Sequence, residues 1–151
     1  MFTLVPSNFF NPEKEREALE GVAQFGKDCA VKHIDIPQYD AVLVYSTDED
    51  SIVSTNEMAG ILSRLPDCPA YNKILCSIIG DMLHIAIAQG KSLLLANCFR
   101  IQDFTTAEYF IFLAVKSLQI NPEVSTICWA SDLEPPQEMS LYRYFKAVIR
   151  I

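Results

Sequence analysis

Cysteine and histidine are the side chains in this sequence that most readily bind metal ions or act as nucleophiles. The chain has five cysteines and two histidines, but no C-x-x-C pair, and neither His33 nor His84 pairs with a cysteine at zinc-finger spacing. No serine or cysteine stands in a G-x-S-x-G sequence. The sequence therefore predicts no metal site and no catalytic residue. We interpret Cys76, Cys98 and Cys128, which lie in apolar segments, as small core side chains, and His84 as a packing residue.

Carboxylates are the remaining candidates for chemistry. Three consecutive acids, Asp48-Glu49-Asp50, cannot all point at one ion from an extended loop, and their spacing is not that of a calcium loop. We predict a solvated loop there. Asp103, Glu108 and Asp132 lie near the ends of predicted elements, where helix caps and turns favour acids without any catalytic role.

Composition and charge exclude several classes of protein. Half of the 151 residues are hydrophobic, which is enough for a substantial core. Twelve basic against nineteen acidic residues give a net charge of −7, which disfavours binding to nucleic acid. No uninterrupted apolar run approaches the ~18 residues of a membrane span, and the first residues do not resemble a signal peptide. We expect a cytoplasmic protein with no membrane association.

The middle of the chain predicts a meander of three strands. Ile74–Ile79, Met82–Ala88 and Leu93–Phe99 are rich in apolar and β-branched residues, and short turn sequences separate them. The turns are Gly80-Asp81 and Gln89-Gly90-Lys91, which fit the spacing of tight hairpins. Three antiparallel strands should therefore follow one another in a single sheet.

The meander is followed by a helix, a strand, a helix and a strand. The first helix, Phe104–Leu118, begins near Asp103 and is apolar on nearly every face, so we expect it to be buried all round. The later elements are a strand at Thr126–Ala130, a Pro135-Pro136 turn, a helix at Gln137–Phe145 and a strand at Ala147–Ile151. The resulting order, β-β-β-α-β-α-β, predicts a ribonuclease-H-like unit with a mixed five-stranded sheet over residues 71–151.

The N-terminal part predicts a partial copy of the same unit over residues 1–66, in the order strand, helix, strand, helix, with one extra strand. Asn11 caps the first helix, and a capping box of Ser54 and Glu57 starts the second, which ends at Pro66. The expected elements are a strand at Phe2–Val5, a helix at Pro12–Phe25, strands at Val31–Ile36 and Ala41–Ser46, and a helix from Ser54.

Two stretches carry a resemblance to a known family. They are Phe2-Thr3-Leu4-Val5-Pro6 and Leu93-Leu94-Leu95-Ala96-Asn97-Cys98-Phe99, the second leading into a helix that contains Tyr109. The chain resembles an uncharacterised bacterial family of unknown function that has an actin-like ATPase fold. Members of that family are typically longer, with a meander and a helix ahead of the first matching strand. The resemblance therefore implies that the strand at Phe2–Val5 has an unprotected edge, and we expect a partner chain, self-association or a longer parent protein.

The resemblance also indicates where a ligand would bind. Actin-like ATPases hold phosphates on hairpin turns, which places the candidate residues at Ser77, Gly80 and Asp81. The strand before this turn has apolar residues where the superfamily carries its aspartate, so we interpret the turn as structural and nuclease activity as excluded. The leading hypothesis is a non-catalytic scaffold or binding module without a cofactor. The alternative is a diverged nucleotide-binding ATPase or kinase-like enzyme that uses ATP with magnesium.

Overall fold

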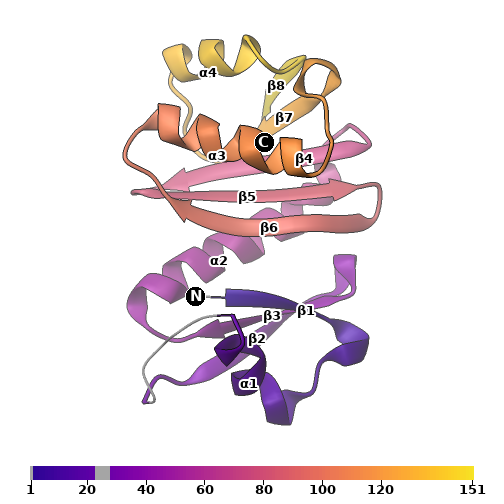
Figure 1. The fold of residues 1–151 in the computed structure, drawn as a ribbon, viewed down its shortest axis with the longest axis vertical. Coiled ribbons are helices and arrows are strands. Elements are labelled where there is room, and N and C mark those ends of the chain that lie inside the picture. The colour runs from indigo at the N-terminus through magenta and orange to yellow at the C-terminus, as the bar shows by residue number, and fades with distance from the viewer. Residues whose placement is uncertain (1, 23–27) are drawn as a thin grey trace. The chain divides into compact units, whose positions relative to one another are not determined.

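The computed structural model describes residues 2–22 and 28–151, and the chain divides into two compact units, residues 1–63 and 64–151. Figure 1 shows the helices and strands of both units, which we describe separately. Within the described residues, no helix combines the length and hydrophobicity needed to cross a bilayer. Short 3₁₀ turns η1 to η5 occupy Ser7–Phe9, Pro12–Lys14, Pro37–Tyr39, Leu65–Asp67 and Pro122–Val124.

The first unit contains a three-stranded antiparallel sheet in the order β1-β3-β2. Leu19 of α1 packs on Val42 and Val44 of the central strand, and these three buried side chains form a small core. The nearly continuous apolar run of β3, in which Ala41 to Val44 are all buried, is typical of a strand covered on both faces, as a central strand is. The elements are β1 at Phe2–Pro6, α1 at Glu15–Glu20, β2 at Val31–Ile36, β3 at Ala41–Ser46 and α2 at Glu49–Arg64.

The first helix differs from the prediction at both ends. Asn11 does cap it, because its side chain accepts a 3.0 Å hydrogen bond from the backbone N–H of Glu13. The first turn, however, is the 3₁₀ helix η2, and the described α-helix covers Glu15–Glu20. The predicted end at Phe25 lies outside the described residues.

The start of α2 corrects two predictions. Asp48 begins this helix: its Oδ2 accepts a 3.1 Å bond from the backbone N–H of Ser51, and its Oδ1 accepts a 2.6 Å bond from Ser46 Oγ. Burial raises the pKa of Asp48, but the hydrogen bonds from Ser46 and Ser51 outweigh it and lower the pKa to about 2. The prediction of a solvated loop was therefore wrong, as was a helix start at Ser54, which lies inside α2.

The second unit has a mixed five-stranded sheet in the order β6-β5-β4-β7-β8. The meander β4-β5-β6 is antiparallel, and β7 joins it in parallel beside β4, with β8 parallel to β7. This is the predicted β-β-β-α-β-α-β order. The elements are β4 at Asn72–Ile79, β5 at Met82–Gln89, β6 at Ser92–Arg100, α3 at Phe104–Ser117, β7 at Thr126–Trp129, α4 at Pro135–Tyr142 and β8 at Ala147–Arg150.

Both helices of this unit pack on the same face of the sheet. Ile111 and Val115 of α3 and Leu141 of α4 share one buried cluster with Ile85 and Trp129 of the strands. Figure 1 shows α3 running alongside the meander, with α4 beyond it. The Ser140 hydroxyl of α4 donates to both carboxylate oxygens of Glu108 on α3, at 2.9 and 3.0 Å. This contact joins the two helices directly.

Three predictions about these helices were wrong in detail. Tyr109 and Leu113 are 61% and 50% exposed, so α3 is not buried all round, because α4 covers only part of the helix surface that the sheet leaves open. Pro135 and Pro136 do not form a separate turn but occupy the first turn of α4. Proline is tolerated there because a backbone N–H at these positions would have no hydrogen-bond partner within the helix. A reciprocal capping box between Glu134 and Gln137 starts α4, which ends at Tyr142 instead of Phe145.

Candidate functional site

The predicted phosphate turn lies at one end of the second sheet, where β4 and β7 both end. A hollow of about 230 Å³ there is lined by residues of the turn and of the start of α3, including Gly80, Asp81, Asp103 and Phe104. A second hollow, of about 520 Å³, lies at the carboxyl ends of β4, β7 and β8 and shares Ile78 with the first. The carboxyl ends of parallel strands are where ligands bind in open α/β sheets.

Gly80 is the residue of this turn that has room for a ligand. Its φ of +61° is a left-handed conformation that favours glycine, and a Cβ built on it would meet nothing within 4 Å. Ser77, in contrast, is fully buried in β4, and its register partner on β5 is the fully buried His84. The structure therefore places Gly80 and Asp81 together at the hollow and keeps Ser77 away from it.

Asp81 is already engaged by a cation. Its carboxylate accepts a 2.7 Å bond from the guanidinium of Arg100, at the end of β6, and its backbone oxygen accepts from the N–H of Ile101 at 2.8 Å. Asp103 caps α3, and hydrogen bonds from the backbone N–H and the hydroxyl of Thr106 lower its pKa below the usual value. Both carboxylates of the first hollow thus have structural partners.

The second hollow contains a polar residue that the sequence analysis missed. Ser131 Oγ accepts from the backbone N–H of Ile78 at 2.9 Å and from the indole N–H of Trp129 at 3.0 Å, so it fixes the loop after β7 against β4. Its position just after a parallel strand was a signal that could have identified it. Arg150, the cation of this hollow, donates to the backbone oxygen of Leu133 and to Glu138, at 2.8 and 2.9 Å.

Most of the thiols lie in the interior of the fold. Cys76 and Cys128 are buried, as predicted, and so is Cys68, whereas Cys98, which was also predicted to be a core side chain, is only half-buried. Burial raises the pKa of the Cys76 thiol, which disfavours the thiolate that attacks substrates or binds metals. Within residues 2–22 and 28–151, no three His, Cys, Asp or Glu side chains converge in a way that could hold a metal ion.

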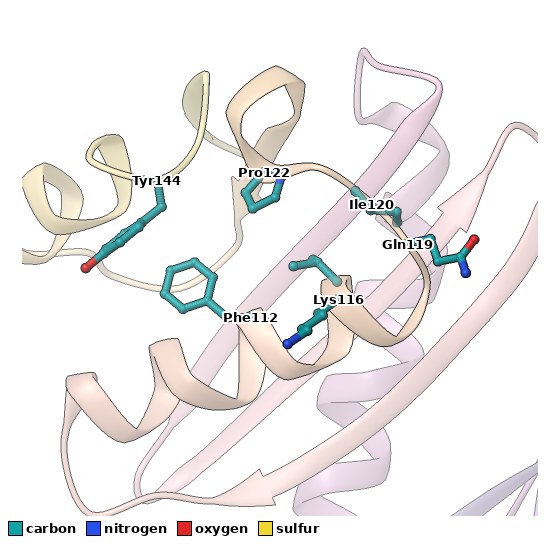
Figure 2. Close-up of a pocket in the computed structure, with 7 residues that line it drawn as sticks. Phe112, Lys116, Gln119, Ile120, Pro122 and Tyr144 are labelled. Carbon is teal, nitrogen blue, oxygen red and sulfur yellow. The ribbon is translucent and has the colours of Figure 1, made fainter.

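A third hollow lies at the opposite end of α3 and has a different character. Its volume is about 470 Å³, and Figure 2 shows the residues that line it. Phe112 and Tyr144 pack edge to face, with ring centroids 4.6 Å apart, and Pro122 lies beside them. Nothing in the sequence analysis identified this hollow, because its walls come from two segments far apart in the chain.

The fold defined by this sheet is that of the actin-like ATPases. The chain is similar to a crystal structure from Bacteroides thetaiotaomicron VPI-5482, described as a protein with actin-like ATPase fold and unknown function, with a TM-score of 0.81 and 18% sequence identity. The match covers 99% of this chain and 64% of that one, so this chain spans less than two thirds of its structural neighbour. At this identity the similarity establishes the fold.

The sequence itself establishes the family. The model of DUF3822, a protein family of unknown function, matches residues 52–148, and the chain belongs to this family. No curated protein matches the chain. The resemblance to a family of unknown function with an actin-like fold is therefore confirmed.

Proposed function

We propose that this protein is a non-catalytic member of the actin-like fold that acts as a scaffold or binding module. The observation that carries the proposal is the 2.7 Å ion pair between Asp81 and Arg100 at the turn where an actin-like ATPase would hold phosphate. The strand that leads into this turn, Asn72–Ile79, contains no acidic residue. An acid in the turn that is already paired with a cation is poorly suited to position magnesium.

The charges around the turn also favour this proposal. The smaller hollow is lined by the carboxylates of Asp81 and Asp103 and, among the described residues, by no lysine or arginine. In the larger hollow, Arg150 is already bonded to Leu133 and Glu138. A nucleotide phosphate would lie beside carboxylates at the first hollow. At the second it would lie beside a guanidinium that already donates hydrogen bonds within the chain. Both arrangements make the binding free energy of the phosphate less favourable.

The alternative, a diverged nucleotide-binding ATPase or kinase-like enzyme, has one observation in its favour. Gly80 combines a left-handed backbone with open space above its Cα, which is the property that lets a backbone approach a phosphate. Under this alternative ATP with magnesium is the ligand, and Asp81 is the acid of the turn available to the metal ion once Arg100 releases it.

Titration calorimetry with ATP and magnesium separates the two hypotheses. We expect no binding tighter than about 1 mM, which corresponds to roughly −4 kcal/mol. Tighter binding that the Gly80→Val variant abolishes would favour the enzyme. Gly60→Val is the matched control, because Gly60 also has open space around its Cα but lies on α2, in the first unit of the chain. Binding that both variants retain would point to a nucleotide site elsewhere.

Self-association provides the positive test of a scaffold. Within the described residues of the first unit, β1 is an edge strand that pairs with β3 alone, and such an edge can accept a strand from another chain. We expect light scattering to show a mass that rises with concentration, and Thr3→Lys, a charge placed on the edge, to reverse this. A monodisperse monomer at all concentrations would count against self-association.

A further inference from the structure

The hollow at the carboxyl end of α3 has the dimensions of a site for a small organic molecule. Its volume of about 470 Å³ lies within the range of roughly 300–1,000 Å³ that is usual for small-molecule sites. Five apolar residues contribute to its walls: Phe112 and Val115 from α3, Ile120 and Pro122 from the connection to β7, and Tyr144 from the segment after α4. In Figure 2 Tyr144 and Gln119 lie on opposite sides of the group of lining residues.

The walls of this hollow are pre-formed by contacts that do not require a ligand. The Phe112 ring packs edge to face on Tyr144 and lies 6.0 Å from the Phe145 ring. The backbone N–H of Ile120 donates to Val115 at 2.9 Å, and that of Lys146 donates to Pro122 at 3.3 Å, so both connections are fixed against their neighbours. A rigid apolar site loses little conformational entropy when a ligand binds, because its side chains are already ordered.

The polar groups of the hollow favour an anion. Lys116 and Gln119 are its polar lining residues, and no carboxylate among the residues that the structure describes lines it, although the chain as a whole carries a net charge of −7. Lys116 has no ion pair and no side-chain hydrogen bond within the part of the chain that the structure describes. The same holds for Lys146, whose backbone lies beside Pro122. An unengaged ammonium group beside an apolar surface complements a carboxylate attached to an apolar tail.

We propose that this hollow binds a small amphipathic carboxylate, with its apolar tail between Phe112, Tyr144 and Pro122 and its carboxylate at Lys116. A folded partner helix is a poorer fit, because a helix with its side chains is about 10 Å wide and the hollow has a volume of only about 470 Å³. The inference is independent of the proposed scaffold role, since the hollow shares no lining residue with the phosphate turn.

Fluorescence displacement tests the proposal on the full chain. The probe is 1-anilinonaphthalene-8-sulfonate, an apolar anion whose emission rises in an apolar site, and the competitors are octanoate and 1-octanol. We expect octanoate to displace the probe at least about tenfold better than 1-octanol, because only the carboxylate accepts a charge-assisted hydrogen bond. Lys116→Gln should weaken octanoate about tenfold and leave 1-octanol unchanged.

Lys91→Gln is the matched control, since Lys91 is exposed in the turn between β5 and β6 and does not line the hollow. Lys116 is also exposed, so its variant should fold, which circular dichroism verifies. The proposal is wrong if Lys116→Gln binds octanoate as the unmodified chain does, if 1-octanol competes equally well, or if octanoate fails to displace the probe at about 10 mM. It is also wrong if light scattering shows a dimer, if the Tyr144→Ala variant is monomeric, and if octanoate does not dissociate the dimer of the unmodified chain. A second copy of the chain would then occupy the hollow.

Discussion

The two ends of α3 contrast in how their polar groups are used. At the amino end, Asp103 caps the helix and Asp81 is paired with Arg100, so each charge beside the phosphate turn has a partner. At the carboxyl end, the Lys116 ammonium has no partner within the described residues, and Lys116 is an exposed residue at the rim of a mostly apolar hollow. The charged groups at the phosphate turn are therefore engaged in contacts within the chain, whereas the charged group at the other end of α3 is not.

The largest change in stability should come from removing the packing at the amino end of α3. Trp129 is 1% exposed, packs against Phe104 at the start of α3 with ring centroids 5.8 Å apart, and donates to Ser131. Trp129→Ala should lower the free energy of unfolding by about 3–5 kcal/mol in urea titration, because it leaves a large cavity. Tyr109→Ala, at a side chain on α3 that is 61% exposed, is the control and should change it by less than about 0.5 kcal/mol.

Phe112→Ala tests the carboxyl end in the same way. Phe112 is half-buried, so its removal should cost about 2 kcal/mol, which combines partial loss of burial with loss of the edge-to-face pair with Tyr144. Urea titration of Phe112→Ala, Tyr144→Ala and the double variant measures the pair separately. Strict additivity of the two single variants would show that the rings do not stabilise each other.

Gly80→Ala sharpens the comparison by testing whether the phosphate turn is a structural hairpin. The left-handed φ of +61° should make alanine cost about 1 kcal/mol, although no atom obstructs its Cβ. Gly60→Ala has equally open surroundings but lies inside α2, so it should stabilise by up to about 1 kcal/mol. Thermal unfolding of the two variants should therefore shift in opposite directions. A stabilised Gly80→Ala would show that the turn does not adopt this conformation.

The smallest effect concerns Glu108, which lies between the two ends of α3. Burial raises its pKa above the ordinary value of 4.5, against hydrogen bonds from Ser140 and the charge of Arg143. A raised folded-state pKa means that the stability gained by protonation is present below the unfolded value and is lost as pH rises through the folded value. The unmodified chain should therefore gain stability relative to Glu108→Gln between pH 7 and pH 4, by less than about 1 kcal/mol.

Urea midpoints of both proteins at the two pH values measure this difference, because every other titrating group is common to them. An equal difference at pH 7 and pH 4 would show that Glu108 ionises as freely in the folded chain as in the unfolded one.

Local pattern predicted the strands better than the helices. The strands Val31–Ile36 and Ala41–Ser46 follow from apolar segments on either side of a proline turn, and the meander follows from apolar segments and glycine turns. These signals act within a few residues. Helix starts were less certain, because several polar residues can cap a helix: Ser54 matched the sequence signature, yet Asp48 is the cap since Ser46 and Ser51 bond to it. That the first unit is a partial copy of the second stays a prediction.

The candidate site was predictable only in part. The hairpin pattern located Gly80 and Asp81, but it could not reveal that Ser77 is fully buried or that Arg100, nineteen residues away, pairs with Asp81. Whether a phosphate or a partner binds this protein stays a prediction.

By itself the sequence determined the order of the elements and the single mixed sheet of the second unit, because alternation, turn residues and caps are short-range properties of the chain. Only the tertiary structure decided which charges are paired and which side chains enclose a hollow. Glu108 meets Ser140 across thirty-two residues, and Phe112 meets Tyr144 across α3, β7 and α4. Such contacts depend on how helices pack on the sheet, and no local pattern encodes the angle and depth of that packing.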